Sequence, residues 1–168
     1  MRYNGLLGTL PKEIRAFIAC FVVVLSIGFF TGLFFVSETG STDPVGMEEN
    51  YLGNEADEEA EVMKFKKSQR EMLTIVHTHI LSMSLIFFLL GALVWITKAS
   101  KTLKLFLTIE PFFSVIMTFG GIYLLRSGIL WMKYVVMFSG MLMTATFAVS
   151  ALLVLSQTLN SPKTFEQA

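Results

Sequence analysis

The chain is poor in cysteine and in charge. Cys20 is its single cysteine, so no disulfide can form within the chain. Only 15% of the 168 residues are charged, whereas an average soluble domain has about 25%. Basic and acidic residues balance to a formal net charge of zero. No basic stripe with interleaved aromatics is present, so we expect no nucleic-acid partner.

Motifs of common enzyme chemistry are also lacking. The sequence contains no nucleophile–base pair, zinc signature, phosphate-binding glycine loop or carboxylate pair. We therefore expect no hydrolase or transferase activity.

Long apolar runs are what the chain has in abundance. A membrane-spanning helix needs about 20 mostly apolar residues, and residues 16–36, 72–97, 103–125 and 131–155 meet this requirement. The last three runs are joined by short links, which force antiparallel neighbours. The sequence thus predicts an all-α membrane protein with four transmembrane helices in an up-down antiparallel bundle. The first run is too long for a typical signal-peptide core, so we expect it to remain uncleaved.

Basic residues near the helix ends predict the orientation in the membrane. Those at the proposed inner side are Arg2, Lys12, Arg15, Lys98, Lys101 and Lys104. Since cytoplasmic loops are enriched in Lys and Arg, the N-terminus (residues 1–15) and the tail (156–168) are expected to be cytoplasmic, in a bacterial inner membrane. With Lys163 of the tail included, the bias over the whole chain is small, seven basic residues inside against six outside.

An acidic, extracytoplasmic segment, residues 37–71, separates the first two spans. We expect "ETGSTDPVG" to be a flexible, turn-rich linker. The following "NEADEEAEVMKFKKSQR" is expected to form a helix that Asn54 caps and that continues into the second span. Glu61 and Lys64 would pair on its surface. A calcium loop is the alternative, but its regular D-x-D-x-D-G spacing is absent.

Both histidines, His77 and His79, lie at the start of the second span. Residues two apart on a helix point about 200° apart, so the two imidazoles cannot bind one metal together. Thr74, Ser84 and Gly91 share the His77 face, and membrane helices pack through small and polar residues. We therefore predict that His77 points into the bundle and that His79 points to lipid headgroups or a partner.

Neutral imidazole is a common metal ligand, so one hypothesis places haem b or a transition metal at His77. The chain has no further histidine, and Met137 or Met141 would have to supply a haem's second ligand. Arg126 lies at the level of His77 and could hold a haem propionate or a lipid phosphate. The alternative is that both histidines are rim residues bonded to water or headgroups. Arg126 would then belong to an interfacial belt of aromatic and basic residues.

Glu110 is the only acid well inside a predicted span. A charge at the bilayer centre costs upward of about 2.5 kcal/mol, so such a residue is a functional candidate. Its helix face also carries Ser114 and Thr118, which indicates a polar interior. These hydroxyls and Thr144 could relay a proton or an ion. The alternative is a hydrogen bond between helices at a kink caused by Pro111.

Three functions remain open from the sequence. The first is an accessory or cofactor-holding subunit with a site at His77, and the second is a proton or ion pathway in a homo-oligomer that uses Glu110. About 14 Å separates these two residues along the bilayer normal, so they do not form one site. The third is a purely structural membrane partner. Besides the lipid bilayer, we expect a homo-oligomer or a larger membrane complex as partner, since the "GFFTG" step, Gly28 to Gly32, permits close helix approach.

Overall fold

Helices make up the regular structure of the computed structural model, which describes residues 3–39, 42–56, 60 and 62–160. Four helices are long and apolar enough to cross a membrane: α1 (Lys12–Glu38), α3 (Gln69–Ile96), α4 (Lys101–Arg126) and α5 (Met132–Leu159). Two short ones accompany them, the 3-10 helix η1 (Leu6–Thr9) and α2 (Pro44–Leu52). The described part of the chain contains no strand. The predicted all-α fold with four spans is confirmed.

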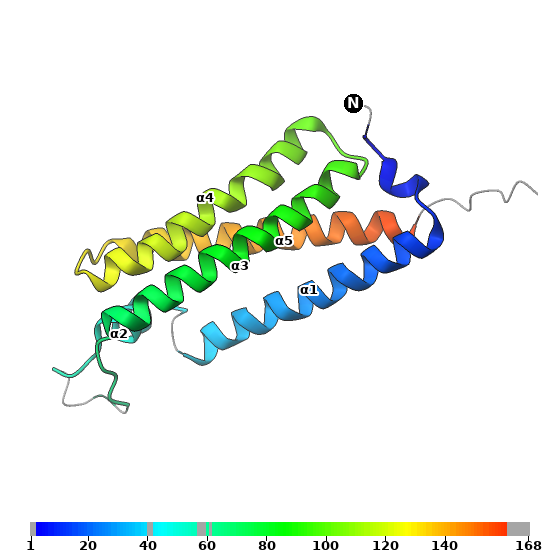
Figure 1. Ribbon diagram of the computed structural model, residues 1–168. Coiled ribbons are helices and arrows are strands. Elements are labelled where there is room, and N and C mark those ends of the chain that lie inside the picture. Colours follow the sequence, from blue (N-terminus) through cyan, green and yellow to red (C-terminus); the bar gives the residue numbers. More distant parts are fainter. Residues whose placement is uncertain (1–2, 40–41, 57–59, 61, 161–168) are drawn as a thin grey trace, which may run out of the picture.

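The four long helices run up and down in alternation (Figure 1). α4 packs against both α3 and α5, and α1 packs mainly against α5. The N-terminal segment and the end of α5 lie at one end of the bundle, whereas α2 lies at the other. The connections are short where antiparallel neighbours pack most closely, as expected for this topology.

Large aromatic side chains fill the centre of the bundle. The rings of Phe29 and Phe147 stack with their centroids 3.9 Å apart. Phe87 meets both rings edge-on, at 6.4 and 6.2 Å. Such stacked and edge-to-face pairs contribute stability beyond the area they bury. The cluster joins α1, α3 and α5 in one core.

Glycines allow close contact at α4, but those of the "GFFTG" step have no such role within the chain. A methyl group added to Gly121 would lie 2.7 Å from Cγ2 of Val136 on α5. One added to Gly91 of α3 would lie 3.3 Å from Thr108 of α4. Gly28 and Gly32 would meet nothing within 4 Å. Their surface is therefore open to lipid or to a partner.

A buried lysine closes the N-terminal end of the bundle. Lys104 is fully buried, and its Nζ donates to the carbonyl oxygens of Thr97 (2.6 Å) and Trp95 (2.9 Å). It also donates to Oδ1 of Asn4 at 2.9 Å. An ammonium at the C-terminal end of α3 also complements the helix dipole. Lys104 thus holds the N-terminal segment, the end of α3 and the start of α4 together.

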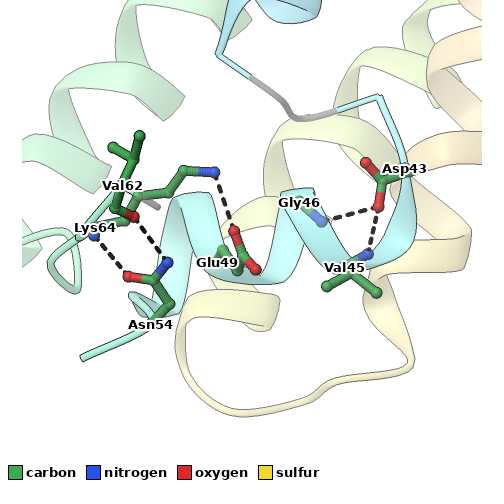
Figure 2. A network of polar contacts seen from close by, with 7 residues as sticks. All are labelled: Asp43, Val45, Gly46, Glu49, Asn54, Val62 and Lys64. Carbon is green, nitrogen blue, oxygen red and sulfur yellow. Dashed lines mark hydrogen bonds and ion pairs between the residues drawn. The ribbon is translucent and has the colours of Figure 1, made fainter. Parts of the chain in front are cut away.

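Helix α2 begins inside the segment expected to be a flexible linker, so that prediction was wrong. Asp43 is its N-cap and accepts hydrogen bonds from the backbone N–H of Val45 and Gly46, each at 3.0 Å (Figure 2). Pro44 occupies the first helical position, where its missing N–H is no loss. The Asp-Pro pair is a helix start, and we interpreted it as a turn.

The predicted acidic helix running into the second span is also wrong. Gly53, at φ 83°, ends α2, and α3 starts only at Gln69 behind a capping box of Ser68 and Glu71. Asn54 caps no helix; its side chain accepts from Lys64 N–H at 2.6 Å and donates to Val62 O at 3.0 Å (Figure 2). The chain folds back on itself here because these bonds replace helical ones. Glu61, the expected partner of Lys64, lies outside the described residues.

Polar contacts fasten this folded-back segment and α2 to the bundle. Lys133 of α5 pairs with Glu48 of α2 at 2.6 Å. Lys64 pairs with Glu49 at 3.2 Å. Nε of Arg126 donates to the carbonyl oxygen of Lys67 at 2.9 Å. The end of the bundle opposite η1 and the end of α5 is therefore covered.

Candidate functional site

Glu110 lies in the interior of α4, nine residues and about 14 Å from the helix start. Its helix face turns toward α5, because Ser114 and Thr118 on the same face are buried. Gly121 continues this face and touches α5 through Val136. The prediction that Glu110 shares a polar, inward face is consistent with this arrangement. Glu110 itself is half-buried.

A groove of about 480 Å³ runs between α4 and α5 at this position. Its polar lining residues are Glu110, Ser114 and Ser139. The apolar ones include Phe106, Ile109 and Phe113 of α4 with Phe138 and Leu142 of α5. This volume lies within the usual range of small-molecule sites, about 300–1,000 Å³.

The groove opens toward the surface that lipid would cover. The side chains of Phe113 and Phe138, one from each helix, are both 64% exposed. Ile109 is exposed beside them. Because α4 and α5 both meet the criteria for a membrane span, a molecule dissolved in the hydrocarbon layer could reach this groove from the side.

The two carboxyl oxygens of Glu110 differ in their hydrogen bonds. Oε1 accepts a hydrogen bond from Oγ of Ser114, one turn further along α4. Oε2 is buried and has no hydrogen-bond partner among the described residues. A buried polar atom without a partner costs about 1–3 kcal/mol, and more if it is charged. A hydrogen-bond donor from outside the described residues would therefore stabilise Oε2.

A second pair of hydroxyls extends the polar face. Oγ1 of Thr118 and Oγ of Ser139 lie 2.7 Å apart, and both side chains are buried. Ser139 also donates to the carbonyl oxygen of Val135 at 2.8 Å. A polar row is thus formed by Glu110, Ser114 and Thr118 of α4 together with Ser139 of α5. It extends over two turns of α4 toward the end of the bundle that α2 covers.

One member of this row was missed and one predicted member does not belong to it. Ser139 escaped the sequence analysis because a single serine in an apolar span carries no signal of its direction. Thr144 hydrogen-bonds the carbonyl oxygen of Gly140 at 2.9 Å, within its own helix. It is not among the residues that line the groove.

The predicted directions of the two histidines are reversed in the structure. His77 is exposed, whereas the ring of His79 stacks on Phe119 of α4 with centroids 4.7 Å apart. Leu90, on the His79 face, is buried, and Phe88, on the His77 face, is exposed. The rule of small residues inside holds for Gly91, which is buried on the His77 face, but not for Thr74, which is exposed near His77.

His79 has one ring nitrogen engaged. Nδ1 lies 2.7 Å from the carbonyl oxygen of Ile75, and since a carbonyl only accepts, Nδ1 carries the hydrogen. In the neutral imidazole Nε2 then bears the lone pair. No group of three His, Cys, Asp or Glu side chains among the described residues is arranged to hold a metal ion.

Comparison with known proteins places the chain in a family. No curated protein and no solved structure matches it. Residues 41–165, which include α2 to α5, match the Aq_1264_TM model, described as a transmembrane helical domain. The match covers most of the chain, both sides of the groove included. The chain therefore belongs to the Aq_1264_TM family of transmembrane helical domains.

Proposed function

We propose that this membrane protein moves protons through a pathway in which Glu110 is the group that binds and releases the proton. The observation that carries the proposal is the buried Oε2 atom of Glu110, which lacks a donor among the described residues. A proton bound to this carboxyl removes the charge that is costly inside a membrane.

The neighbouring hydroxyls suit this role. A hydroxyl both donates and accepts, so Ser114, Thr118 and Ser139 can pass a proton with the help of water. Their row leads from Glu110 toward the end of the bundle where α2 lies. Among the described residues, no other titratable side chain lines the groove. Thr144, part of the relay in our sequence hypothesis, is not needed for this route.

The proposal also includes the orientation of the chain and the membrane in which it lies. We place both termini on the cytoplasmic side of a bacterial inner membrane, because Lys12, Arg15, Lys98 and Lys101 lie at that end of the bundle. Acidic residues Asp43, Glu48 and Glu49 lie at the opposite end. The homo-oligomer or larger complex remains a prediction.

Proton flux into liposomes tests the function. Purified protein is reconstituted with a pH-sensitive dye inside, and a potassium diffusion potential drives protons across the membrane. We expect flux above that of empty liposomes, and we expect Glu110→Gln to abolish it because an amide cannot release a proton. Glu55→Gln makes the same chemical change at an exposed turn and should leave the flux unchanged. Equal flux in Glu110→Gln and the unmodified protein would refute the proposal.

A second variant distinguishes an effect on the proton pathway from an effect on the folding of the protein. Ser139→Ala removes the partner of Thr118 but keeps Glu110, so we expect slower flux with the same helix content. Ser84→Ala on α3, outside the groove lining, is its matched control. If neither Glu110→Gln nor Ser139→Ala changes anything measurable, the purely structural partner remains as the function.

A cofactor-holding subunit is the second candidate, and one observation favours His79 as its ligand. Ligating histidines almost always donate their other ring N–H, and Nδ1 of His79 donates to Ile75 O. Haem b or a transition metal would then meet Nε2 of His79 in place of His77, the ligand in our sequence hypothesis, with Arg126 as a further candidate. Purified protein should show a Soret band or a stoichiometric metal that His79→Ala loses and His77→Ala keeps. A colourless and metal-free preparation would exclude this candidate.

A further inference from the structure

We propose that the groove between α4 and α5 binds a lipophilic amine, with its ammonium group on Glu110 and its hydrocarbon body against the aromatic walls. This inference rests on the proposed function in one respect, because the proton pathway and the amine site both depend on the carboxyl of Glu110. It adds the chemical class of a ligand that competes with the proton for that carboxyl.

The polar end of the groove fits an ammonium group. Oε2 of Glu110 is buried without a donor, and a primary ammonium offers three. Ser114 and Ser139 are the other polar residues of the groove lining. The positive charge also complements the carboxylate, since opposite charges attract strongly where water is scarce. A fatty acid would instead bring a second carboxylate to this position.

The rest of the groove fits an apolar body. Apart from Glu110 and two serines, its lining is hydrocarbon and aromatic, including Phe106, Phe113 and Phe138. A bare metal cation such as Ca²⁺ needs six to eight oxygen ligands, which this lining does not provide. The groove opens on the lipid side and lies deep in the bilayer, so its ligand must enter from the hydrocarbon layer. An amine with a hydrocarbon body meets all of these conditions.

Charge balance couples binding of the amine to release of a proton from Glu110. An ammonium pairs with Glu110 only when the carboxyl has lost its proton, so binding to the protonated site releases one proton. No covalent bond other than the O–H bond of the carboxyl is broken. Since no other titratable side chain in the described part of the chain lines the groove, we expect one proton released per amine bound.

Binding of tritiated octylamine to the full-length protein in lipid nanodiscs tests the inference. Bound octylamine is measured by scintillation proximity over a range of concentrations, which separates saturable binding from partition into lipid. We expect saturable binding that weakens at least about tenfold in Glu110→Gln, because a charged hydrogen bond is lost. Glu55→Gln should bind as the unmodified protein does. Equal saturable binding by Glu110→Gln, or no saturable binding at all, would overturn the inference.

Two competitor molecules test which chemistry the site selects. Octanol has the same chain and one neutral donor, whereas octyltrimethylammonium has the charge and no N–H. Unlabelled octylamine should displace the tritiated ligand far better than either of them. Displacement by octanol with equal potency would refute the ammonium as the recognised group. Equal potency of octyltrimethylammonium would refute the hydrogen bond to Oε2.

A variant that keeps the carboxyl guards against misfolding of Glu110→Gln. Ile109→Trp enlarges a side chain at the mouth of the groove, where Ile109 is exposed. We expect it to weaken octylamine binding. Retained flux together with retained amine binding in Glu110→Gln would refute both assignments of this carboxyl's role. Lost flux together with equal octylamine binding would refute the amine site and leave the proton pathway standing.

Discussion

The ammonium of Lys104 donates to the carbonyl oxygen of Thr97 across 2.6 Å, and both residues are fully buried. The same carbonyl accepts the backbone N–H of Gly5 at 3.1 Å. Asn4 contributes its side-chain oxygen to Lys104 and to the backbone N–H of Ala99, at 2.9 and 3.1 Å. The N-terminal segment is thus bound to the link between α3 and α4 through one lysine.

We predict that Lys104→Met destabilises the protein by about 3 kcal/mol, since methionine keeps the apolar stem but removes three charge-assisted donors. The carbonyl oxygen of Trp95 and Asn4 Oδ1 would then lose a buried partner. Thermal unfolding in detergent, followed by circular dichroism, measures the effect. Lys101→Met, at an exposed position one turn earlier, should change the free energy of unfolding by less than about 0.5 kcal/mol. Equal behaviour of the two variants would contradict the role given to Lys104.

Close packing of α4 against α5 yields a second prediction. Gly121→Ala places a methyl group 2.7 Å from Cγ2 of Val136, and the buried, β-branched valine has little freedom to turn away. We expect a loss of about 1–3 kcal/mol in the free energy of unfolding. Gly120→Ala, whose added methyl meets nothing within 4 Å, should be neutral or slightly stabilising. Val136→Ala should restore part of the stability lost in Gly121→Ala.

The helical spans and the face of Glu110 could be predicted from the sequence, because each depends on local patterns. Twenty apolar residues are the length that a bilayer requires. Glu110, Ser114 and Thr118 are spaced by four, so they share a face in any regular helix. The direction of that face toward α5 and the pairing of Thr118 with Ser139 depend on how two helices meet, which no local pattern contains.

Other errors of the sequence analysis have distinct causes. The reversed histidines reflect an interior in which the ring of His79 stacks on Phe119 of α4 and does not lie among small residues. Helix α2 carried a readable signal in its Asp-Pro start, which we misinterpreted. The burial of Lys104 was not readable, since its acceptors come from Asn4, a hundred residues away, and from the end of α3.

The N-cap of α2 should make this helix sensitive to acid. Hydrogen bonds from Gly46 and Val45 lower the pKa of Asp43 below its ordinary value of 3.8. A carboxyl whose pKa is lower in the folded state contributes stability above its unfolded pKa and loses it as the pH falls through the folded value. We therefore expect amide hydrogen exchange in α2 to accelerate below about pH 4, relative to the intrinsic rate. Asp43→Asn still accepts hydrogen bonds but does not titrate, and should abolish this acid-induced change.

The orientation of the chain gives a prediction that whole cells can test. The native thiol is first removed by Cys20→Ala, and single cysteines are then introduced at Met63 and Lys101, both exposed and at opposite ends of the bundle. Because Lys and Arg favour the cytoplasmic side, we expect a membrane-impermeant maleimide to label Met63→Cys in intact cells. It should label Lys101→Cys only after the cells are opened. The reverse pattern would invert the topology, and the polar row would then lead from Glu110 toward the cytoplasm. Labelling of both cysteines in intact cells would place both ends of the bundle outside and would contradict the four-span arrangement in the membrane.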